Sequence, residues 1–274
     1  MNNKKIILIM LIILLIILIV YNRGNKDNMT NSINKKIPKV IHLTYFSKKN
    51  VKQKVWDNLE KYAKDYKIMF YDDDDCIKFL KDNYGNKWVN KFKNIKIGAH
   101  KADFFRYCLL YKVGGIYMDI KLEPKVYVNT IFDHTKDNLL YTVLGSRETF
   151  FKSILKLFNK GTNNGHIFQA LVATYPNNPL MKELYEDFFR IEDKDIYYNI
   201  YTQEFYYKLQ KLIDIKKIQP GVYTYKNNID KVYLFEEQNL KINGDTRDRY
   251  GGYFKIMDKD KILFNSRYHD FPWK

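Results

Sequence analysis

Apolar residues change their spacing within residues 99–123, from the period of a helix to the period of a strand. In residues 99–112 they recur three or four positions apart, which predicts a helix. From Ile116 to Leu122 apolar and polar residues alternate strictly, which predicts a strand with one apolar and one polar face. Gly114 and Gly115 stand between them, where the chain ends a helix and turns back into a strand.

Polar side chains take fixed places in this predicted helix and strand. Asp103 and Arg106 are three residues apart, so they lie side by side on the helix. Tyr117, Asp119 and Lys121 share the polar face of the strand. An Asp/Arg pair at this spacing is usually a surface ion pair of little energetic weight, so the spacing alone does not establish a functional site.

The remaining pattern predicts helices that alternate with strands. Strands are predicted at residues 37–45, 67–71 and 139–144, and helices at residues 51–66, 76–80, 83–96, 180–189 and 202–213. Four aspartates at residues 72–75 directly precede a helical run, and we interpret them as caps for its free N–H groups rather than as metal ligands. His42 lies among apolar neighbours, which indicates a structural histidine. This order of elements predicts an α/β nucleotide-binding domain with buried parallel strands near its start.

The N-terminal end divides into three segments before this domain. Residues 1–5 are a basic head, residues 6–21 are an unbroken run of mainly Ile and Leu, and residues 22–36 are polar and without periodicity. A helix over residues 6–21 extends about 24 Å, which reaches across a thin membrane or spans with snorkelling flanks. We predict a transmembrane signal anchor at residues 6–21, a linker at 22–36 and a domain over 37–274.

A cleaved signal peptide is the alternative interpretation of residues 6–21, because such peptides carry an apolar region of about 7–15 residues. No small-x-small cleavage site follows Val20, which favours an uncleaved anchor. Lys4 and Lys5 favour a cytosolic N-terminus by the positive-inside rule, although Arg23 and Lys26 weaken that bias. We predict a single-pass, type II membrane protein whose domain is lumenal or extracytoplasmic.

Composition limits the partners of the chain. The 274 residues carry a net charge of +16, but the basic residues are scattered and form no long block. Diphosphate donors and anionic lipid headgroups are therefore better partners than nucleic acid, and a basic membrane-surface or nucleic-acid-binding module stays as a lesser alternative. Cys76 and Cys108 are the two cysteines, too few for a disulfide framework.

Residues 102–119 follow the pattern Ala-Asp-x-x-Arg-Tyr-x-x-Leu-Tyr-x-x-Gly-Gly-Ile-Tyr-x-Asp. This pattern resembles the signature of the DXD-containing sugar transferases, which include initiating α-mannosyltransferases of fungal type, capsular polysaccharide sugar transferases and glucosylating toxin domains. The resemblance is good over residues 37–125, patchier over 161–180 and weak at the C-terminus. It implies a GT-A type, Rossmann-like domain that binds a nucleotide sugar, with a C-terminal helical or loop extension.

The resemblance also implies roles for single residues. It places Asp103, Arg106 and Asp119 against the sugar and ribose hydroxyls of the donor, with Tyr117 supporting that network. The family opens with Ile-Pro-Lys-x-Ile-His-x-x-Trp, whose aromatic residue stacks on the base, and Tyr45 holds that position here.

Three further candidates lie nearer the C-terminus. The resemblance places Asn164 near the transferred sugar, with Asn163 nearly as good a choice, although Asn-Asn-Gly is also simply a good turn. The chain ends on a segment similar to the family's closing His-x-x-x-Ser-Trp. In that segment Trp273 would shield the donor from water, and His269 would reach the diphosphate or a metal.

The family pattern ends in Asp-x-Asp, whereas this chain has Asp119-Ile120-Lys121. The second Asp of the family ligates a divalent cation, Mn²⁺ or Mg²⁺, that bridges the donor diphosphate. Lys121 cannot ligate a metal because an ammonium has no lone pair, but it can place a positive charge against the leaving diphosphate. Asp119 and His269 remain the candidate metal ligands, and Asp119 and Lys121 the candidate catalytic residues.

Two functions follow from this departure. The first is a membrane-anchored glycosyltransferase that moves a hexose from a nucleotide-sugar donor to a glycan, protein or lipid-linked acceptor, with retention of configuration expected from the resemblance. The second is a catalytically weak or inactive binder of carbohydrate or nucleotide sugar. Strict dependence of turnover on a metal would contradict a role for Lys121 as the electrophile.

Overall fold

The computed structural model describes residues 35–145, 165–191, 200–240 and 254–266. The chain divides into two units after Asn34, and all described residues belong to the second unit. The predicted head and anchor, and nearly all of the predicted linker, therefore lie outside the described residues. In the four described ranges, no helix combines the length and the apolar character needed to cross a membrane.

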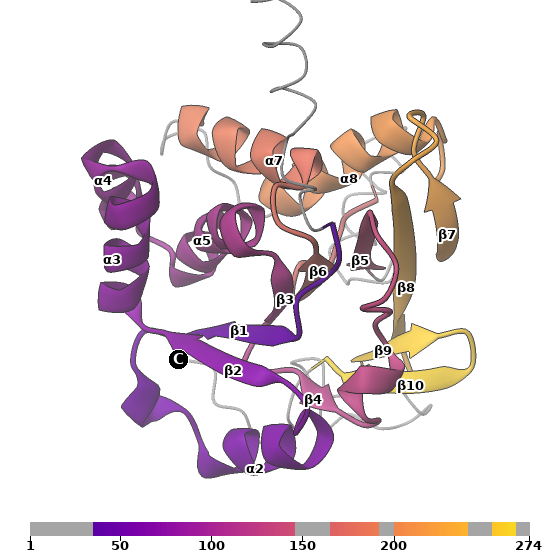
Figure 1. Ribbon diagram of the computed structural model, residues 1–274, viewed down its shortest axis with the longest axis horizontal. Coiled ribbons are helices and arrows are strands. Elements are labelled where there is room, and N and C mark those ends of the chain that lie inside the picture. The colour runs from indigo at the N-terminus through magenta and orange to yellow at the C-terminus, as the bar shows by residue number, and fades with distance from the viewer. Residues whose placement is uncertain (1–34, 146–164, 192–199, 241–253, 267–274) are drawn as a thin grey trace, which may run out of the picture. The chain divides into compact units, whose positions relative to one another are not determined.

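One mixed sheet organises the described residues (Figure 1). Its strands are β1 (Val40–Thr44), β2 (Lys67–Tyr71), β3 (Gly115–Met118), β4 (Glu123–Pro124), β5 (Leu139–Leu144), β6 (Leu171–Thr174), β7 (Gly221–Thr224), β8 (Lys231–Asn239), β9 (Phe254–Asp258) and β10 (Lys261–Asn265). Their order is β2-β1-β3-β6-β5-β8-β9-β10-β4, and β7 pairs with β8. The strands β2, β1 and β3 run parallel, as predicted, whereas β6 is antiparallel to both of its neighbours.

Helices cover both faces of the sheet. They are α2 (Gln53–Tyr62), α3 (Asp73–Tyr84), α4 (Asn86–Asn94), α5 (Gly98–Val113), α7 (Pro179–Arg190) and α8 (Ile200–Ile213), with short 3₁₀ turns at Lys48–Asn50 and Val128–Thr130. Figure 1 shows α5, α7 and α8 on one side of the sheet and α2 on the other. These helices agree with the predicted ones to within a few residues at their ends.

The hydrophobic core separates into two clusters, one for each face of the sheet. Side chains of α3, α4, α5, α7 and α8 pack with Tyr117 on one face. Side chains of α2 pack on the other face with Ile116 and Met118. The alternation that predicted one apolar and one polar face therefore places neighbouring residues in two different cores, and all of β3 is buried.

The strand predicted to run to Leu122 ends earlier. β3 stops at Met118, and the next residues form a turn in which the N–H of Leu122 donates to the carbonyl of Asp119 at 2.9 Å. The N–H of Asp119 donates to the carbonyl of Ala170 at 2.8 Å, so Asp119 is the first residue past the strand. Within this turn, the Lys121 ammonium lies 3.2 Å from a carboxylate oxygen of Asp119.

The C-terminal part differs from the predicted helical or loop extension. Residues 221–265 contribute β7, β8, β9 and β10 to the sheet, and β10 pairs with β4. β8 is parallel to β5 across six residue pairs, so this part completes the sheet instead of lying over it. The predicted helices of this extension are confirmed as α7 and α8, but the expectation of loops beyond Ile213 was wrong, because it relied on turn residues and gave no weight to the apolar residues of β8.

The aspartates at the start of α3 act as predicted. Asp72 caps the helix by accepting from the N–H of Asp75, and the Asp75 side chain accepts from the N–H of Asp72 in return. This reciprocal arrangement satisfies two N–H groups that a helix start leaves without partners.

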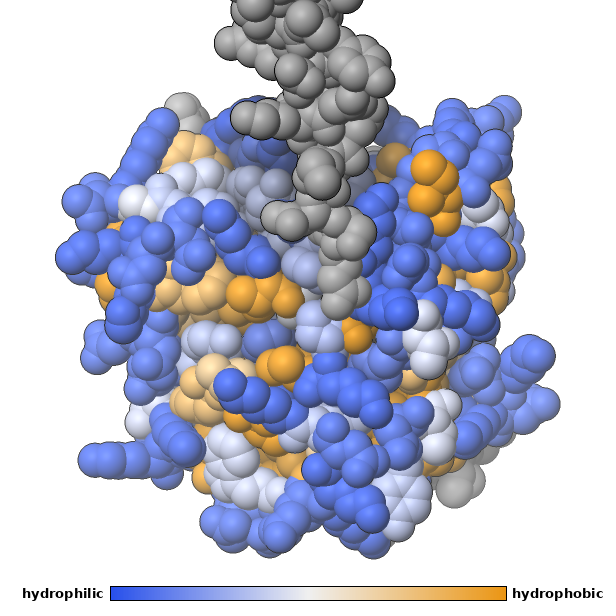
Figure 2. All heavy atoms as spheres, viewed as in Figure 1, coloured by the Kyte–Doolittle hydropathy of each residue, from blue (hydrophilic) through white to orange (hydrophobic). Residues whose placement is uncertain are grey.

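Figure 2 shows hydrophilic side chains over much of the face in view, with apolar side chains between them.

Candidate functional site

A pocket of about 460 Å³ opens where β1, β2 and β3 end and where α3 and α5 begin. Ligand sites of open α/β sheets lie at the carboxyl ends of parallel strands, where the chain leaves the sheet. The polar and aromatic lining includes Thr44, Tyr45, Phe46, Tyr71, Asp73, Lys96, Lys101, Tyr117, Asp119 and Lys121. The pocket therefore combines an aromatic wall with a group of charged side chains.

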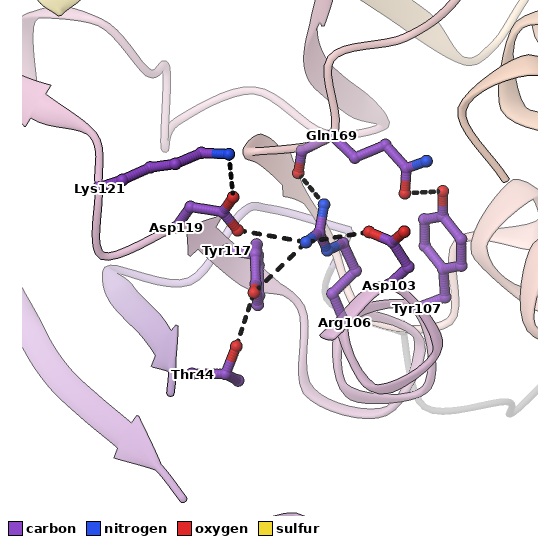
Figure 3. A network of polar contacts seen from close by, with 8 residues as sticks. All are labelled: Thr44, Asp103, Arg106, Tyr107, Tyr117, Asp119, Lys121 and Gln169. Carbon is purple, nitrogen blue, oxygen red and sulfur yellow. Dashed lines mark hydrogen bonds and ion pairs between the residues drawn. The ribbon is translucent and has the colours of Figure 1, made fainter. Parts of the chain in front are cut away.

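A guanidinium connects the predicted helix and strand residues (Figure 3). Arg106 Nη2 lies 3.1 Å from Asp103 Oδ1 and 3.2 Å from Asp119 Oδ1. Its planar group also lies 4.3 Å from the centre of the Tyr117 ring, a cation–π contact. The four residues that the sequence placed on two different elements thus converge at one place.

Arg106 is more deeply buried than a ligand-binding residue usually is. Only 3% of the residue is exposed, and it is not part of the pocket lining. Its Nη1 donates to the carbonyl of Gln169, whose side chain accepts from Tyr107. Arg106 therefore holds the pocket wall from behind, and Tyr117 and Asp119 form the surface that faces the pocket.

Lys121 completes a row of alternating charges. Its Nζ lies 3.2 Å from Asp119 Oδ2, so the two oxygens of Asp119 each contact a different cation. The ammonium also lies 5.3 Å from the centre of the Phe168 ring. Both Asp119 and Lys121 line the pocket.

Burial and charge act differently on the two carboxyl groups. Burial raises the pKa of Asp103, and the attraction of Arg106 only partly offsets this. Burial also acts to raise the pKa of Asp119, but Lys121 and Arg106 outweigh it and hold that pKa below its usual value. The surroundings therefore favour the ionised form of Asp119 and disfavour that of Asp103.

Two aromatic residues follow β1 at the pocket. The rings of Tyr45 and Phe46 lie 4.5 Å apart, and Phe46 is 59% exposed. Thr44 precedes them and exchanges a hydrogen bond of 2.7 Å with the hydroxyl of Tyr117. The end of β1 thus carries both an aromatic platform and a contact to the charged network.

Some predicted residues lie outside the described part, and some contacts were not predicted. Asn164, His269 and Trp273 are outside the described residues. Gln169 was missed because a single Gln between apolar residues carries no sequence signal. Phe46 had a signal, since it follows Tyr45 at the end of a predicted strand.

The family signature implies a metal, so the chemistry of the possible ligands matters. Among the described residues, no three His, Cys, Asp or Glu side chains gather where they could hold an ion. Asp119 is the candidate ligand there, and its two oxygens already contact Arg106 and Lys121. The described residues of this site therefore do not fit a divalent cation.

Residues 49–138 match the model of a protein family described as "Glycosyltransferase sugar-binding region containing DXD motif". This match confirms the resemblance drawn from residues 102–119 and includes Asp103, Arg106, Tyr117, Asp119 and Lys121. It covers neither β1 nor β5 and the strands that follow β5.

Curated relatives with related names match parts of the chain. An uncharacterized glycosyltransferase of Acanthamoeba polyphaga mimivirus is 29% identical over 157 residues, which are 56% of this chain and 56% of that protein. Mannosyl phosphorylinositol ceramide synthase of Saccharomyces cerevisiae is 32% identical over 136 residues, 44% of this chain and 34% of that protein. The chain thus spans between about a third and somewhat more than half the length of these relatives.

Among solved structures, "PaToxG Glycosyltransferase" superposes with a TM-score of 0.45 at 14% sequence identity. The superposition covers 70% of this chain and 79% of that chain. This likeness is too low to define the fold, which is instead defined by the strand order of the sheet.

Proposed function

We propose that this chain transfers a hexose from a nucleotide sugar to an acceptor hydroxyl. The proposal proceeds from the match of residues 49–138 to the glycosyltransferase family with a DXD motif. One observation carries the proposal: Asp119, Tyr117 and Lys121 line a pocket at the carboxyl ends of parallel strands, and Arg106 contacts Asp119 and Tyr117 from behind. The parallel strands β2, β1 and β3 support a GT-A type nucleotide-binding half.

The donor has a place for each of its parts in this proposal. The base stacks on Tyr45, beside Phe46, because an aromatic face binds a flat heterocycle without needing a particular hydrogen-bond pattern. Asp119 accepts hydrogen bonds from sugar and ribose hydroxyls, since an ionised carboxylate is a strong acceptor. Asp103 contacts these hydroxyls by resemblance. Tyr117 is fixed by Thr44 and Arg106 and supports Asp119. Asn164 and Trp273 complete the donor site by resemblance.

The acceptor and the location of the protein belong to the same proposal. One curated relative is named a mannosyl phosphorylinositol ceramide synthase, and another, of Schizosaccharomyces pombe, an inositol phosphoceramide mannosyltransferase. These names support mannose as a donor sugar to test and a lipid-linked acceptor beside glycans and proteins. Residues 6–21 would anchor the chain in a membrane with the domain on the lumenal or extracytoplasmic side, and we expect transfer with retention.

Release of free nucleotide from a panel of nucleotide sugars tests the proposal on the full-length chain. We expect release from at least one donor, and a loss of about a hundredfold or more in Asp119→Asn, because that change removes a charged acceptor from the donor site. Asp74→Asn is the matched control, since Asp74 is an exposed carboxylate at the start of α3 and outside the pocket lining. Thermal melting of both variants separates loss of activity from loss of folding.

The outcomes also distinguish the transferase from the second candidate, a protein that binds nucleotide sugar without turnover. Lys121 in place of a carboxylate is the observation that favours it. Binding of a nucleotide sugar by calorimetry without any release would support this binder. If the chain neither binds nor cleaves any of the nucleotide sugars, both candidates are contradicted. Full release of nucleotide by Asp119→Asn would contradict the assignment of the site.

A further inference from the structure

We infer that the Lys121 ammonium, held by Asp119, takes the place of the divalent cation in this site and neutralises the leaving diphosphate. The inference rests on the proposed function. It gives Asp119 a role beyond contact with the donor, namely to position a cation that belongs to the chain itself.

The contacts of Asp119 carry the first step. Oδ1 lies 3.2 Å from Arg106 and Oδ2 lies 3.2 Å from Lys121, so each carboxylate oxygen already faces a cation. A divalent ion bound at Asp119 would have to displace the Lys121 ammonium and would find no second carboxylate at residue 121. The same contacts keep the ammonium at the pocket wall, because a Lys side chain otherwise samples many rotamers.

The charges of the pocket carry the second step. The described lining residues include three cations, Lys96, Lys101 and Lys121, and two anions, Asp73 and Asp119, which gives the lining one net positive charge. An Asp at position 121 would turn this into one net negative charge. A negative lining needs a bound cation before it accepts a diphosphate, whereas a positive lining attracts the diphosphate directly.

The bond changes then balance without a metal. The bond between the anomeric carbon and the diphosphate oxygen breaks, and its electron pair stays on that oxygen. The acceptor oxygen forms the new bond to the anomeric carbon, and the proton of the acceptor hydroxyl passes to the departing diphosphate. Lys121 stabilises the charge that develops on this leaving group by a charge-assisted hydrogen bond.

Binding of inorganic pyrophosphate and of Mn²⁺ tests the inference without requiring turnover. By calorimetry in the presence of a chelator, we expect the full-length chain to bind pyrophosphate and Lys121→Ala to bind it about tenfold or more weakly. Lys125→Ala is the matched control, since Lys125 also forms an ion pair after β3, with Glu123 at 2.9 Å, but lies outside the pocket lining. We expect Lys121→Asp to bind Mn²⁺ at this site and the unaltered chain not to bind it there.

Activity with a chelator gives the second measurement. We expect wild-type nucleotide release to survive chelation, and Lys121→Asp to release nucleotide only with Mn²⁺. Wild-type release that disappears with the chelator would overturn the inference while the proposed function stands. Pyrophosphate binding that depends on Lys121, without release from any nucleotide sugar, would support the inference and contradict the transferase. Unchanged pyrophosphate binding in Lys121→Ala would overturn the inference whatever the activity.

Discussion

At the scale of single residues, Arg106 shows how a side chain can serve a site without facing it. Its guanidinium contacts Asp103, Asp119 and the carbonyl of Gln169 while nearly all of its surface is buried. A guanidinium presents several donors in one plane, so it can hold groups from a helix, a strand end and a loop at once. An ammonium at the same place could not keep this geometry.

Replacement of Arg106 by Ala should affect stability as well as activity. The change leaves the largely buried Asp103 without its ion-pair partner and leaves Asp119 with Lys121 alone, and breaking a buried pair in this way costs about 3–5 kcal/mol. We expect the free energy of unfolding, measured with urea, to fall by this amount and nucleotide release to be lost.

Lys78→Ala is the control for the Arg106 change, because Lys78 pairs with Asp82 on the exposed side of α3. Such exposed pairs contribute about 0–1 kcal/mol. Equal stability losses in the two variants would contradict the view that Arg106 acts as a buried connector.

At the scale of elements, the junction between α5 and β3 sets the position of the site. Gly114 and Gly115 have φ values of +62° and +100°, which residues with a Cβ rarely adopt. A Cβ on Gly115 would lie 2.8 Å from His42 Nε2 and 2.9 Å from the carbonyl oxygen of Val40. The close approach of β3 to β1 therefore depends on glycine at position 115. The hydrogen bond between Thr44 on β1 and Tyr117 on β3 depends on the same close approach.

Gly115→Ala should destabilise the protein by about 2 kcal/mol or more, because both the positive φ and the backbone of β1 oppose the new methyl group. Gly98→Ala is the matched control: a Cβ there meets nothing within 4 Å, and Gly98 has no positive φ. We expect Gly98→Ala to be neutral or to stabilise by up to about 1 kcal/mol. Equal midpoints of urea unfolding for the two variants would contradict this account of the junction.

At the scale of the whole molecule, one buried histidine connects three elements of the parallel half. His42 on β1 donates from Nε2 to the carbonyl of Gly114 at 3.0 Å and accepts at Nδ1 from the hydroxyl of Tyr71 at 3.3 Å. Burial lowers the pKa of His42 to about 4, although its bond to Gly114 acts to raise it. His42 therefore stays neutral when the protein is folded, which agrees with its predicted structural role.

The pKa of His42 makes stability depend on pH. Below about pH 6.5 the unfolded chain binds a proton at His42 that the folded protein does not. The contribution of the neutral His42 to the free energy of unfolding is therefore present above this pH and is lost as the pH falls toward 4. Between pH 7 and pH 5 this amounts to about 2 kcal/mol. We expect urea unfolding of His42→Gln to change less over this interval, and equal changes in both proteins would contradict the assignment.

The sequence by itself determined the local elements and the residues of the central stretch. Helical spacing predicted α5, and the same spacing placed Asp103 beside Arg106, because a helix turns once in 3.6 residues whatever surrounds it. The capping role of Asp72 was also local, since it depends on the four residues that begin α3. Alternation correctly separated Ile116 and Met118 from Tyr117.

Only the tertiary structure decided what lies beyond these local patterns. The end of β3 at Met118 depends on pairing with β6, and the carbonyl of Gln169 reaches Arg106 from 63 residues away. The burial of Arg106, the two cations on Asp119 and the completion of the sheet by residues 221–265 are likewise contacts between distant segments. Periodicity reports which face a residue takes on its own element, but the packing of elements determines what that face meets.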